Sequence, residues 1–360
     1  MKLLCSLALF AAIAFGDPIY TITSLGQVGG SSSTTGYAVN DAGAVAGWSQ
    51  NSSGVTQAFG SGAGGLASLP LGSGTVSYAY GINDAGTVVG DTYIGGQSHA
   101  TIWSGSSATP RVLGANSYAM AVNGVGEVAG ASNGQAMVVV DGQVQSLATL
   151  AGVNWSAAYG INNAGEVVGE SELANGTFRG VIWGSGGGAV LVGTLGGSNS
   201  DATGVNDSGE VVGFASLASG YQNAFSMTGG AMTDLGTLGE SSYAYGVNDS
   251  GEIVGYSYLD NGAQHAFLYD DGSMLDLNSL LPANSGWVLE EAFGINNAGQ
   301  ITGMGLYDGQ QTAFLMTDPG TIGAVPEPSV VLLMAAGMGL MVLLKRLAML
   351  KTTPCLEDQT

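Results

Sequence analysis

Histidine is the side chain that most often moves protons near neutral pH, and this chain has two, His99 and His265. Both fall at the same position of a repeated segment. The other copies of the segment place Gln57, Gln135, Arg179, Asn223 and Thr312 there. A position that accepts such different polar residues is a polar position in a strand. We therefore expect neither histidine to act in catalysis or to bind a metal, and the sequence predicts no catalytic residue and no cofactor.

Carboxylates offer a second chemistry, because glycosidases use two of them on either side of the scissile bond. Among the acidic residues, Asp91, Glu170, Glu172, Glu290 and Glu291 depart from the recurrent turn pattern. Their spacing does not place any two of them at a hydrolytic separation. A secreted carbohydrate-active enzyme, either a glycosidase or a lyase, therefore remains the alternative to a non-enzymatic protein.

Asparagine followed by aspartate suggests calcium, which takes oxygen ligands. Asp41, Asp84, Asp207 and Asp249 follow a recurrent Asn, but the equivalent residues in the other copies are Gly124, Asn163 and Asn297. None of these segments matches the calcium loop D-x-[DN]-x-[DN]-G. Turn formation explains every copy, so we predict no metal site.

Aromatic residues could bind sugars by stacking on their rings. One set lies three residues before the recurrent Asn, where regular recurrence favours packing between repeats; it comprises Tyr37, Tyr80, Tyr159, Tyr245 and Phe293, with Met120 and Thr203 in the other copies. A second set varies between copies and is expected in connections at the faces of the fold. Its members are the candidate sugar-stacking residues Tyr78, Tyr118, Trp155, Tyr243 and Trp287.

One decapeptide occurs seven times along the chain and sets the spacing of these residues. The copies are AVNDAGAVAG, GINDAGTVVG, AVNGVGEVAG, GINNAGEVVG, GVNDSGEVVG, GVNDSGEIVG and GINNAGQITG. Their third residues are Asn40, Asn83, Asn123, Asn162, Asn206, Asn248 and Asn296, which are 39 to 48 residues apart. Every copy has Gly at its sixth and tenth positions. The sixth position suits the left-handed residue of a hairpin turn, and the tenth suggests a bulge or a close backbone approach.

A second hairpin follows each motif, most clearly in Gln264-His265-Ala266-Phe267 before Asp271-Gly272. Two hairpins give four short strands in about 42 residues, which is typical of a β-propeller blade. We predict an all-β, seven-bladed propeller of four-stranded antiparallel blades over residues 17–320, with a solenoid as the alternative. Residues 19–25 resemble a fourth strand, so we expect them to pair near residues 312–316 and close the ring.

The alternation of this His-Ala-Phe element with the N-D-x-G motif resembles the bacterial extracellular HAF-repeat family over about residues 19–318. For that family the resemblance implies a secreted repeat protein without an established chemistry.

Both ends of the sequence predict export. Residues 1–16 read as a signal peptide, with Lys2, an apolar run, and the small residues Ala14 and Gly16 before the expected signal-peptidase cut. The exported part then contains no Cys. Residues 321–329 form a linker, residues 330–344 are uncharged and apolar, and residues 345–360 form a basic cytoplasmic tail. The apolar run is at the short end for a transmembrane helix, and the basic flank fits a cytoplasmic side.

The order Pro326-Glu327-Pro328, apolar helix, Lys345-Arg346 resembles the PEP-CTERM sorting tail of exopolysaccharide-producing Gram-negative bacteria. The resemblance implies processing by an exosortase. The protein would be anchored in the inner membrane through its C-terminal helix, and after processing would lie at the cell surface or in the extracellular matrix.

Charge limits the partners of the exported part. The chain has 27 acidic and 6 basic residues and a net charge of −21. Between Asp17 and Val325 the only basic residues are Arg111 and Arg179. This part therefore lacks the basic surface that nucleic acids require, and anionic lipid heads should repel it, so membrane contact is expected through the tail alone. We expect a non-enzymatic structural or binding protein, with extracellular polysaccharide as its candidate ligand.

Overall fold

The computed structural model describes residues 20–30, 33–62, 65–104, 109–148, 150, 155–185 and 188–318. The chain divides into a compact unit that ends at Pro319 and a second unit from Gly320 onward. The predicted signal peptide with Ala14 and Gly16, the linker with Pro326, Glu327 and Pro328, the apolar helix, and the tail with Lys345 and Arg346 lie outside the described residues.

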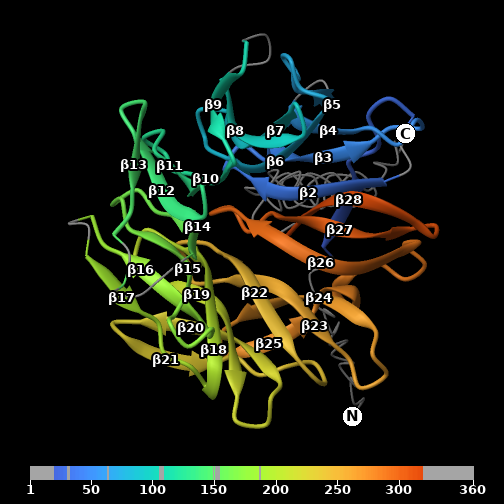
Figure 1. Ribbon diagram of the computed structural model, residues 1–360. Helices are drawn as coiled ribbons and strands as arrows, with labels where there is room; N and C mark the ends of the chain where they lie inside the picture. Colours follow the sequence, from blue (N-terminus) through green and yellow to red (C-terminus); the bar gives the residue numbers. More distant parts are fainter. Residues whose placement is uncertain are drawn as a thin grey trace, which may run out of the picture. The chain divides into compact units, whose positions relative to one another are not determined.

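Seven four-stranded antiparallel sheets form a propeller, and the chain passes from one blade to the next in sequence order (Figure 1). The first strand of each blade, nearest the axis, is β2 (Ser33–Val39), β6 (Val76–Ile82), β10 (Ser117–Val122), β14 (Trp155–Ile161), β18 (Gly196–Val205), β22 (Ser242–Val247) or β26 (Trp287–Ile295). The second is β3 (Val45–Gln50), β7 (Thr87–Ile94), β11 (Val128–Ser132), β15 (Val167–Glu172), β19 (Val211–Leu217), β23 (Ile253–Tyr258) or β27 (Ile301–Tyr307).

The outer two strands of each blade form the second hairpin. The third strands are β4 (Thr56–Gly62), β8 (Gln97–Ser104), β12 (Gln135–Val140), β16 (Phe178–Trp183), β20 (Gln222–Thr228), β24 (Gln264–Asp270) and β28 (Gln310–Thr317). The fourth strands are β5 (Gly65–Ser68), β9 (Arg111–Ala115), β13 (Gln143–Ser146), β17 (Ala189–Leu191), β21 (Ala231–Asp234), β25 (Ser273–Asp276) and β1 (Thr21–Ser24). One 3-10 helix, η1 (Leu277–Leu280), follows β25.

The predicted ring closure is confirmed. The N-terminal strand β1 pairs with β28, with Thr21 opposite Thr317 and Ser24 opposite Phe314. The last blade therefore takes its outermost strand from the other end of the sequence, and blade 7 lies beside β2 of blade 1 (Figure 1). Because β28 now lies between β1 and β27, its outer backbone edge is no longer free to pair with another chain.

The motif turns have the predicted chemistry. In the first copy the Asn40 N–H donates to the Ala44 carbonyl at 3.0 Å, and the Ala44 N–H donates back to Asn40 Oδ1 at 2.8 Å. Gly43 closes the turn with φ of +76°, a conformation that favours glycine. The sixth-position glycines of the other six motifs also have positive φ.

The tenth-position glycines permit a close approach of two backbones. A Cβ on any of them would lie 1.9 to 2.0 Å from a carbonyl oxygen of the first strand; they are Gly47, Gly90, Gly130, Gly169, Gly213, Gly255 and Gly303. Because no side chain fits in that space, the first two strands of every blade require glycine there.

The core lies between neighbouring blades. Ala266 and Phe267 of the His-Ala-Phe element are completely buried. The Phe267 ring packs with Val212 and Ala224 of the preceding blade. Apolar residues of adjacent blades pack together in this way at every junction around the ring. Each blade therefore buries the apolar face of the next.

Candidate functional site

A channel runs along the axis of the propeller, and its two ends differ. One end, here called the Asn end, is formed by the seven motif turns around a cavity of about 190 Å³. The other, here called the aromatic end, is formed by the middle of the first strands around a cavity of about 460 Å³. Seven apolar residues line both cavities and separate them: Val39, Ile82, Val122, Ile161, Val205, Val247 and Ile295.

The motif asparagines form a closed ring of hydrogen bonds at the Asn end. Each side-chain amide donates to the backbone carbonyl of the motif Asn in the next blade, at 2.7 to 3.1 Å. The last bond, from Asn296 to Asn40, joins blade 7 to blade 1. All seven residues are buried, with 3 to 6% of their surface exposed. The side chains are thus fully occupied in holding the blades together.

The residues after these asparagines form a second, exposed ring. The backbone N–H of each donates to a side-chain oxygen of its neighbour, as from Asp41 to Asp84 at 2.8 Å and from Asp207 to Asp249 at 2.9 Å. Gly124 interrupts this ring because it has no side chain to accept the bond from Asp84. These carboxylates therefore bind the backbone of the neighbouring blade and not that of their own turn. Among the described residues, no group of three or more His, Cys, Asp and Glu is arranged to hold a metal ion.

The aromatic end is lined by the set that lies three residues before each motif Asn. Each of these residues is skipped in the pairing of the first two strands, so it forms a bulge; Tyr80, for example, lies between Ala79 and Gly81 at a register shift. The bulge turns the side chain to the axis. The prediction that these residues pack between blades is confirmed for four of them, and the structure adds that they form the channel wall.

The wall of the aromatic end is asymmetric. Rings from four consecutive blades touch one another: Tyr37 stacks on Phe293 with 4.7 Å between centroids and meets the edge of Tyr80 at 5.4 Å, and Tyr245 meets Phe293 at 5.4 Å. Blades 4 and 5 contribute the rings of Tyr159 and Phe214 and, unlike the other blades, also two carboxyl groups. The cavity therefore has an aromatic side and an acidic side.

Glu170 and Asp201 form the acidic side. Glu170 follows the tenth-position glycine of blade 4, and Asp201 lies five residues before the motif Asn of blade 5, so neighbouring blades bring them together. Burial raises the pKa of Asp201 to about 9, and a hydrogen bond with Glu170 and the charge of that group add to the rise. Asp201 is therefore protonated at neutral pH. The Tyr159 hydroxyl also donates to Glu170 Oε1.

Two further carboxyls, one buried and one half-buried, lie near this layer but do not line the cavity. Asp91 has only 4% of its surface exposed, and burial raises its pKa to about 6, although a hydrogen bond from Tyr80 opposes the rise. Burial also raises the pKa of Glu291, which accepts a hydrogen bond from the Gln264 amide at 2.5 Å. Of the five carboxylates that the sequence singled out, only Glu170 therefore lies on the cavity.

The candidate sugar-stacking residues do not lie in connections, so that expectation was wrong. Tyr78, Tyr118, Trp155, Tyr243 and Trp287 all belong to the first strands of their blades. Their variability led to the wrong expectation: the first strands extend beyond the recurrent motif, and strand geometry tolerates different residues there. Tyr78, Tyr118 and Tyr243 lie two residues before the bulge, with Tyr78 stacked parallel to Tyr80 at 6.2 Å. Trp287 is buried against Tyr307, and Trp155 contacts Phe178.

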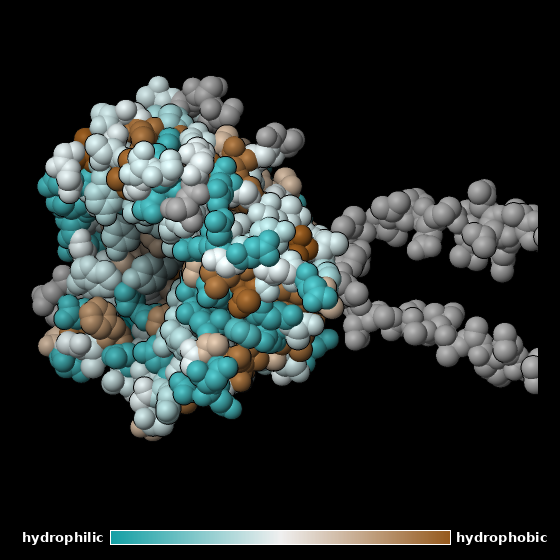
Figure 2. Space-filling model, turned by 90° about the vertical axis from the view of Figure 1, so that its right-hand side faces the viewer, coloured by the Kyte–Doolittle hydropathy of each residue, from teal (hydrophilic) through white to brown (hydrophobic). Residues whose placement is uncertain are grey.

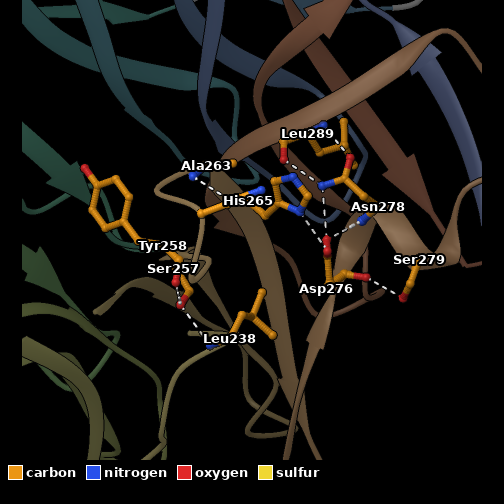
Figure 3. Close-up of polar contacts among 10 residues, drawn as sticks. Leu238, Ser257, Tyr258, Ala263, His265, Asp276, Asn278, Ser279 and Leu289 are labelled. Atoms are coloured by element: carbon orange, nitrogen blue, oxygen red, sulfur yellow. Dashed lines mark hydrogen bonds and ion pairs between the residues drawn. The ribbon is translucent and has the colours of Figure 1, made fainter. Parts of the chain in front are cut away.

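Both histidines lie in third strands, away from the channel lining. His265 Nδ1 is 2.7 Å from Asp276 Oδ2, and Asp276 also accepts a hydrogen bond from the Asn278 amide in the loop that leads to blade 7 (Figure 3). His99 Nδ1 is 3.1 Å from the Leu113 carbonyl. In both cases the imidazole links the third strand to residues in or next to the fourth, which fits the predicted polar strand position.

Sequence reasoning missed Asp201. Its five-residue distance to Asn206 is visible in the sequence, and the equivalent residues of other blades are Thr35, Tyr78, Tyr118, Ala157, Tyr243 and Glu291. A carboxyl at a position otherwise occupied mainly by aromatic or small residues was the available signal. Its proximity to Glu170, 31 residues earlier, follows only from the packing of blades 4 and 5.

No protein-family model matches the chain, and no curated protein matches it. Within the described residues no helix is long and apolar enough to cross a membrane. The predicted span at residues 330–344 lies outside them.

Solved structures resemble the propeller at low identity. One is a puromycin-hydrolysing peptidase of Mycobacterium tuberculosis, with 14% identity and a TM-score of 0.55 over 83% of this chain and 54% of that chain. Others are a gluconolactonase of Xanthomonas campestris (12%, TM-score 0.43, 83% and 90% covered) and a Trypanosoma rangeli sialidase (10%, TM-score 0.41, 82% and 55% covered). This chain spans about half the length of the peptidase. The likeness shows the β-propeller scaffold alone.

Proposed function

We propose that this protein is an exported, non-enzymatic binding module that takes a sugar residue of an extracellular polysaccharide in the aromatic end of its channel. The observation that carries the proposal is the asymmetric wall, with stacked rings on one side and the Glu170–Asp201 pair on the other. A sugar ring has apolar faces that stack on aromatic side chains and hydroxyls that bind carboxyls. The cavity of about 460 Å³ is within the range that small-molecule sites occupy.

The carboxyl geometry supports binding over hydrolysis. Retaining glycosidases hold their two carboxyls about 5 Å apart, and inverting enzymes hold them further apart, so that each can act on its own side of the scissile bond. Glu170 lies close enough to Asp201 to add to the effect of burial, which raises the pKa of Asp201 to about 9. A pair in this state presents one negative charge and several hydrogen-bonding oxygens to a ligand.

Export and anchoring complete the proposal and are supported by the sequence. The signal peptide, the P-E-P segment and the basic pair Lys345-Arg346 are the sorting features of a substrate for an exosortase. The HAF-repeat resemblance indicates the same extracellular setting. Mature protein would therefore act at the cell surface or in the polysaccharide matrix.

A glycan-array screen of the full-length protein in detergent tests the binding proposal. We expect the variants Tyr159→Ala and Phe293→Ala to weaken binding of the retained glycan at least tenfold. Tyr221→Ala, at an exposed ring outside the channel, is the matched control and should bind normally. Release of reducing sugar from a bound polysaccharide, abolished by Glu170→Gln, would replace the proposal with the enzymatic alternative.

Cell fractionation tests the sorting proposal. With an exosortase-containing host, the processed protein should appear at the surface or in the medium. Replacing Pro326, Glu327 and Pro328 together with Ala should leave the unprocessed chain in the inner membrane. Identical distribution of the two proteins would contradict exosortase processing.

A further inference from the structure

We propose that the sugar residue held in the channel carries a free amino group, with its ammonium between the Glu170–Asp201 pair and the opposing aromatic rings. This inference rests on the proposed function and names the class of ligand. The two sides of the cavity are both suited to a cation: carboxylate oxygens attract it by charge, and aromatic faces attract it through their quadrupoles.

The charges around the cavity point to a cation. Glu170 and Asp201 are the charged residue types on its lining, and the other titratable groups there are tyrosines. The two arginines among the described residues bind backbone elsewhere: Arg179 Nε donates to the Ser198 carbonyl at 2.7 Å, and Arg111 donates to the Gly142 carbonyl. A ligand with a carboxylate or sulfate group would therefore meet only like charge.

Among the described residues, two other cavities have aromatic lining but no pair of carboxyls. One of about 590 Å³ includes Glu127 and Trp183, and one of about 410 Å³ includes Tyr20, Trp287 and Tyr307. The face in Figure 2 mixes hydrophilic and hydrophobic residues in small patches. The most exposed large apolar residues, Val125, Val190 and Tyr221, lie on three different blades. Aromatic rings and carboxyls come together at the aromatic end of the channel.

Binding of an ammonium should release a proton. In the free protein Asp201 is protonated at neutral pH, because burial and the neighbouring Glu170 raise its pKa to about 9. The groups that face the two carboxyls are the hydroxyls of Tyr159 and Tyr118, whose pKa values burial raises. Glu172 lies two residues further along β15, and Arg179 of β16 is held by Ser198. An ammonium beside Asp201 stabilises its carboxylate form, so the Asp201 O–H bond breaks and the proton passes to the buffer.

Isothermal titration calorimetry with matched glycans tests the inference. The probes are β-1,4-linked tetramers of glucosamine and of N-acetylglucosamine, together with a permanently charged N,N,N-trimethyl derivative of the first. We expect the amino tetramer to bind at least tenfold more tightly than the acetylated one at pH 6.5. Titration of the trimethyl probe at pH 7.5 in buffers of different ionisation enthalpy should reveal release of close to one proton.

Asp201→Asn separates charge from shape, because Asn has the size of the protonated Asp. This variant should lose the proton release and most of the tenfold preference, but keep its affinity for the acetylated tetramer. Glu291→Gln is the matched control, since it removes a carboxyl from the equivalent strand position of blade 7 but lies off the cavity lining. It should leave both affinities unchanged.

The outcomes distinguish the two proposals. Equal binding of the amino and acetylated tetramers, unaffected by Asp201→Asn, would overturn the amine preference while leaving sugar binding intact. Binding of neither tetramer nor the trimethyl probe would overturn both. Amine-selective binding without proton release, or with selectivity retained in Asp201→Asn, would place the cation elsewhere and also overturn the inference.

Discussion

The two ends of the channel are built from the same seven first strands but follow opposite rules. At the Asn end the same residue recurs in every blade, and its side-chain amide donates to the next blade in the hydrogen-bonded ring. At the aromatic end the residues differ from blade to blade, so rings gather on one side and carboxyls on the other. In this propeller, identical positions join the blades, whereas varied positions leave side chains free to meet a ligand.

The tenth-position glycines let the first two strands of each blade approach closely, and the channel is built on those strands. Substitution of one of them should therefore lower the stability of the protein the most. In Gly47→Ala the new Cβ would lie 2.0 Å from the Thr35 carbonyl oxygen, so β2 and β3 must separate. We expect the free energy of unfolding to fall by about 3 kcal/mol or more in chemical denaturation. Gly60→Ala in the same blade has its nearest neighbour at 3.8 Å and should be close to neutral. Equal effects of the two changes would contradict the close-approach explanation.

Opening the asparagine ring should come next. Asn206→Ala removes the bond to the Asn248 carbonyl at 2.9 Å and leaves the Glu210 N–H without its side-chain acceptor. Because these groups are buried, we expect a loss of about 2 to 4 kcal/mol in urea unfolding. Asp207→Ala, on the exposed ring beside it, should cost less than about 1 kcal/mol. If Asp207→Ala lowered the free energy of unfolding more than Asn206→Ala, the outer ring, and not the asparagines, would join the blades.

The aromatic end should behave in the opposite way, because its acidic side costs stability. The folded protein holds the Asp201 proton up to about pH 9, whereas an unfolded aspartate releases it near pH 4. Folded protein then binds more protons than unfolded protein between these values, so stability falls as pH rises, by at most about 1.4 kcal/mol per pH unit. Asp201→Asn should therefore raise the melting temperature at pH 8 and have little effect at pH 4. A stabilisation that is the same at both pH values would contradict this assignment.

Completing the outer ring should have the smallest effect. Gly124→Asp supplies the missing acceptor for the Asp84 N–H, and its Cβ would meet only the movable Asn163 Oδ1 at 2.8 Å. We expect a gain of about 0.5 to 1 kcal/mol, as for one partly exposed hydrogen bond, in thermal or urea unfolding. Gly124→Ala brings the same Cβ without the acceptor and should show no gain. A gain in both variants would attribute the effect to backbone entropy instead.

Most of the fold was predictable because each blade repeats a local pattern. The turn glycine, the asparagine and the strand alternation act within ten residues, and the resemblance of residues 19–25 to a fourth strand was enough to predict closure. The site was less predictable. Glu170 was among the candidates, but Asp201 was not, and the bulge that turns Tyr37 or Tyr80 to the axis leaves no separate mark in the sequence.

The sequence by itself determined the seven blades, the closure and the acidic charge, because these depend on periodicity and composition. Only the tertiary structure decided which side chains face one another across the axis. Glu170 and Asp201, which are 31 positions apart, meet because the second strand of blade 4 lies against the first strand of blade 5. Burial at that place raises the pKa of Asp201. Blade packing, rather than spacing along the chain, therefore created the asymmetric cavity.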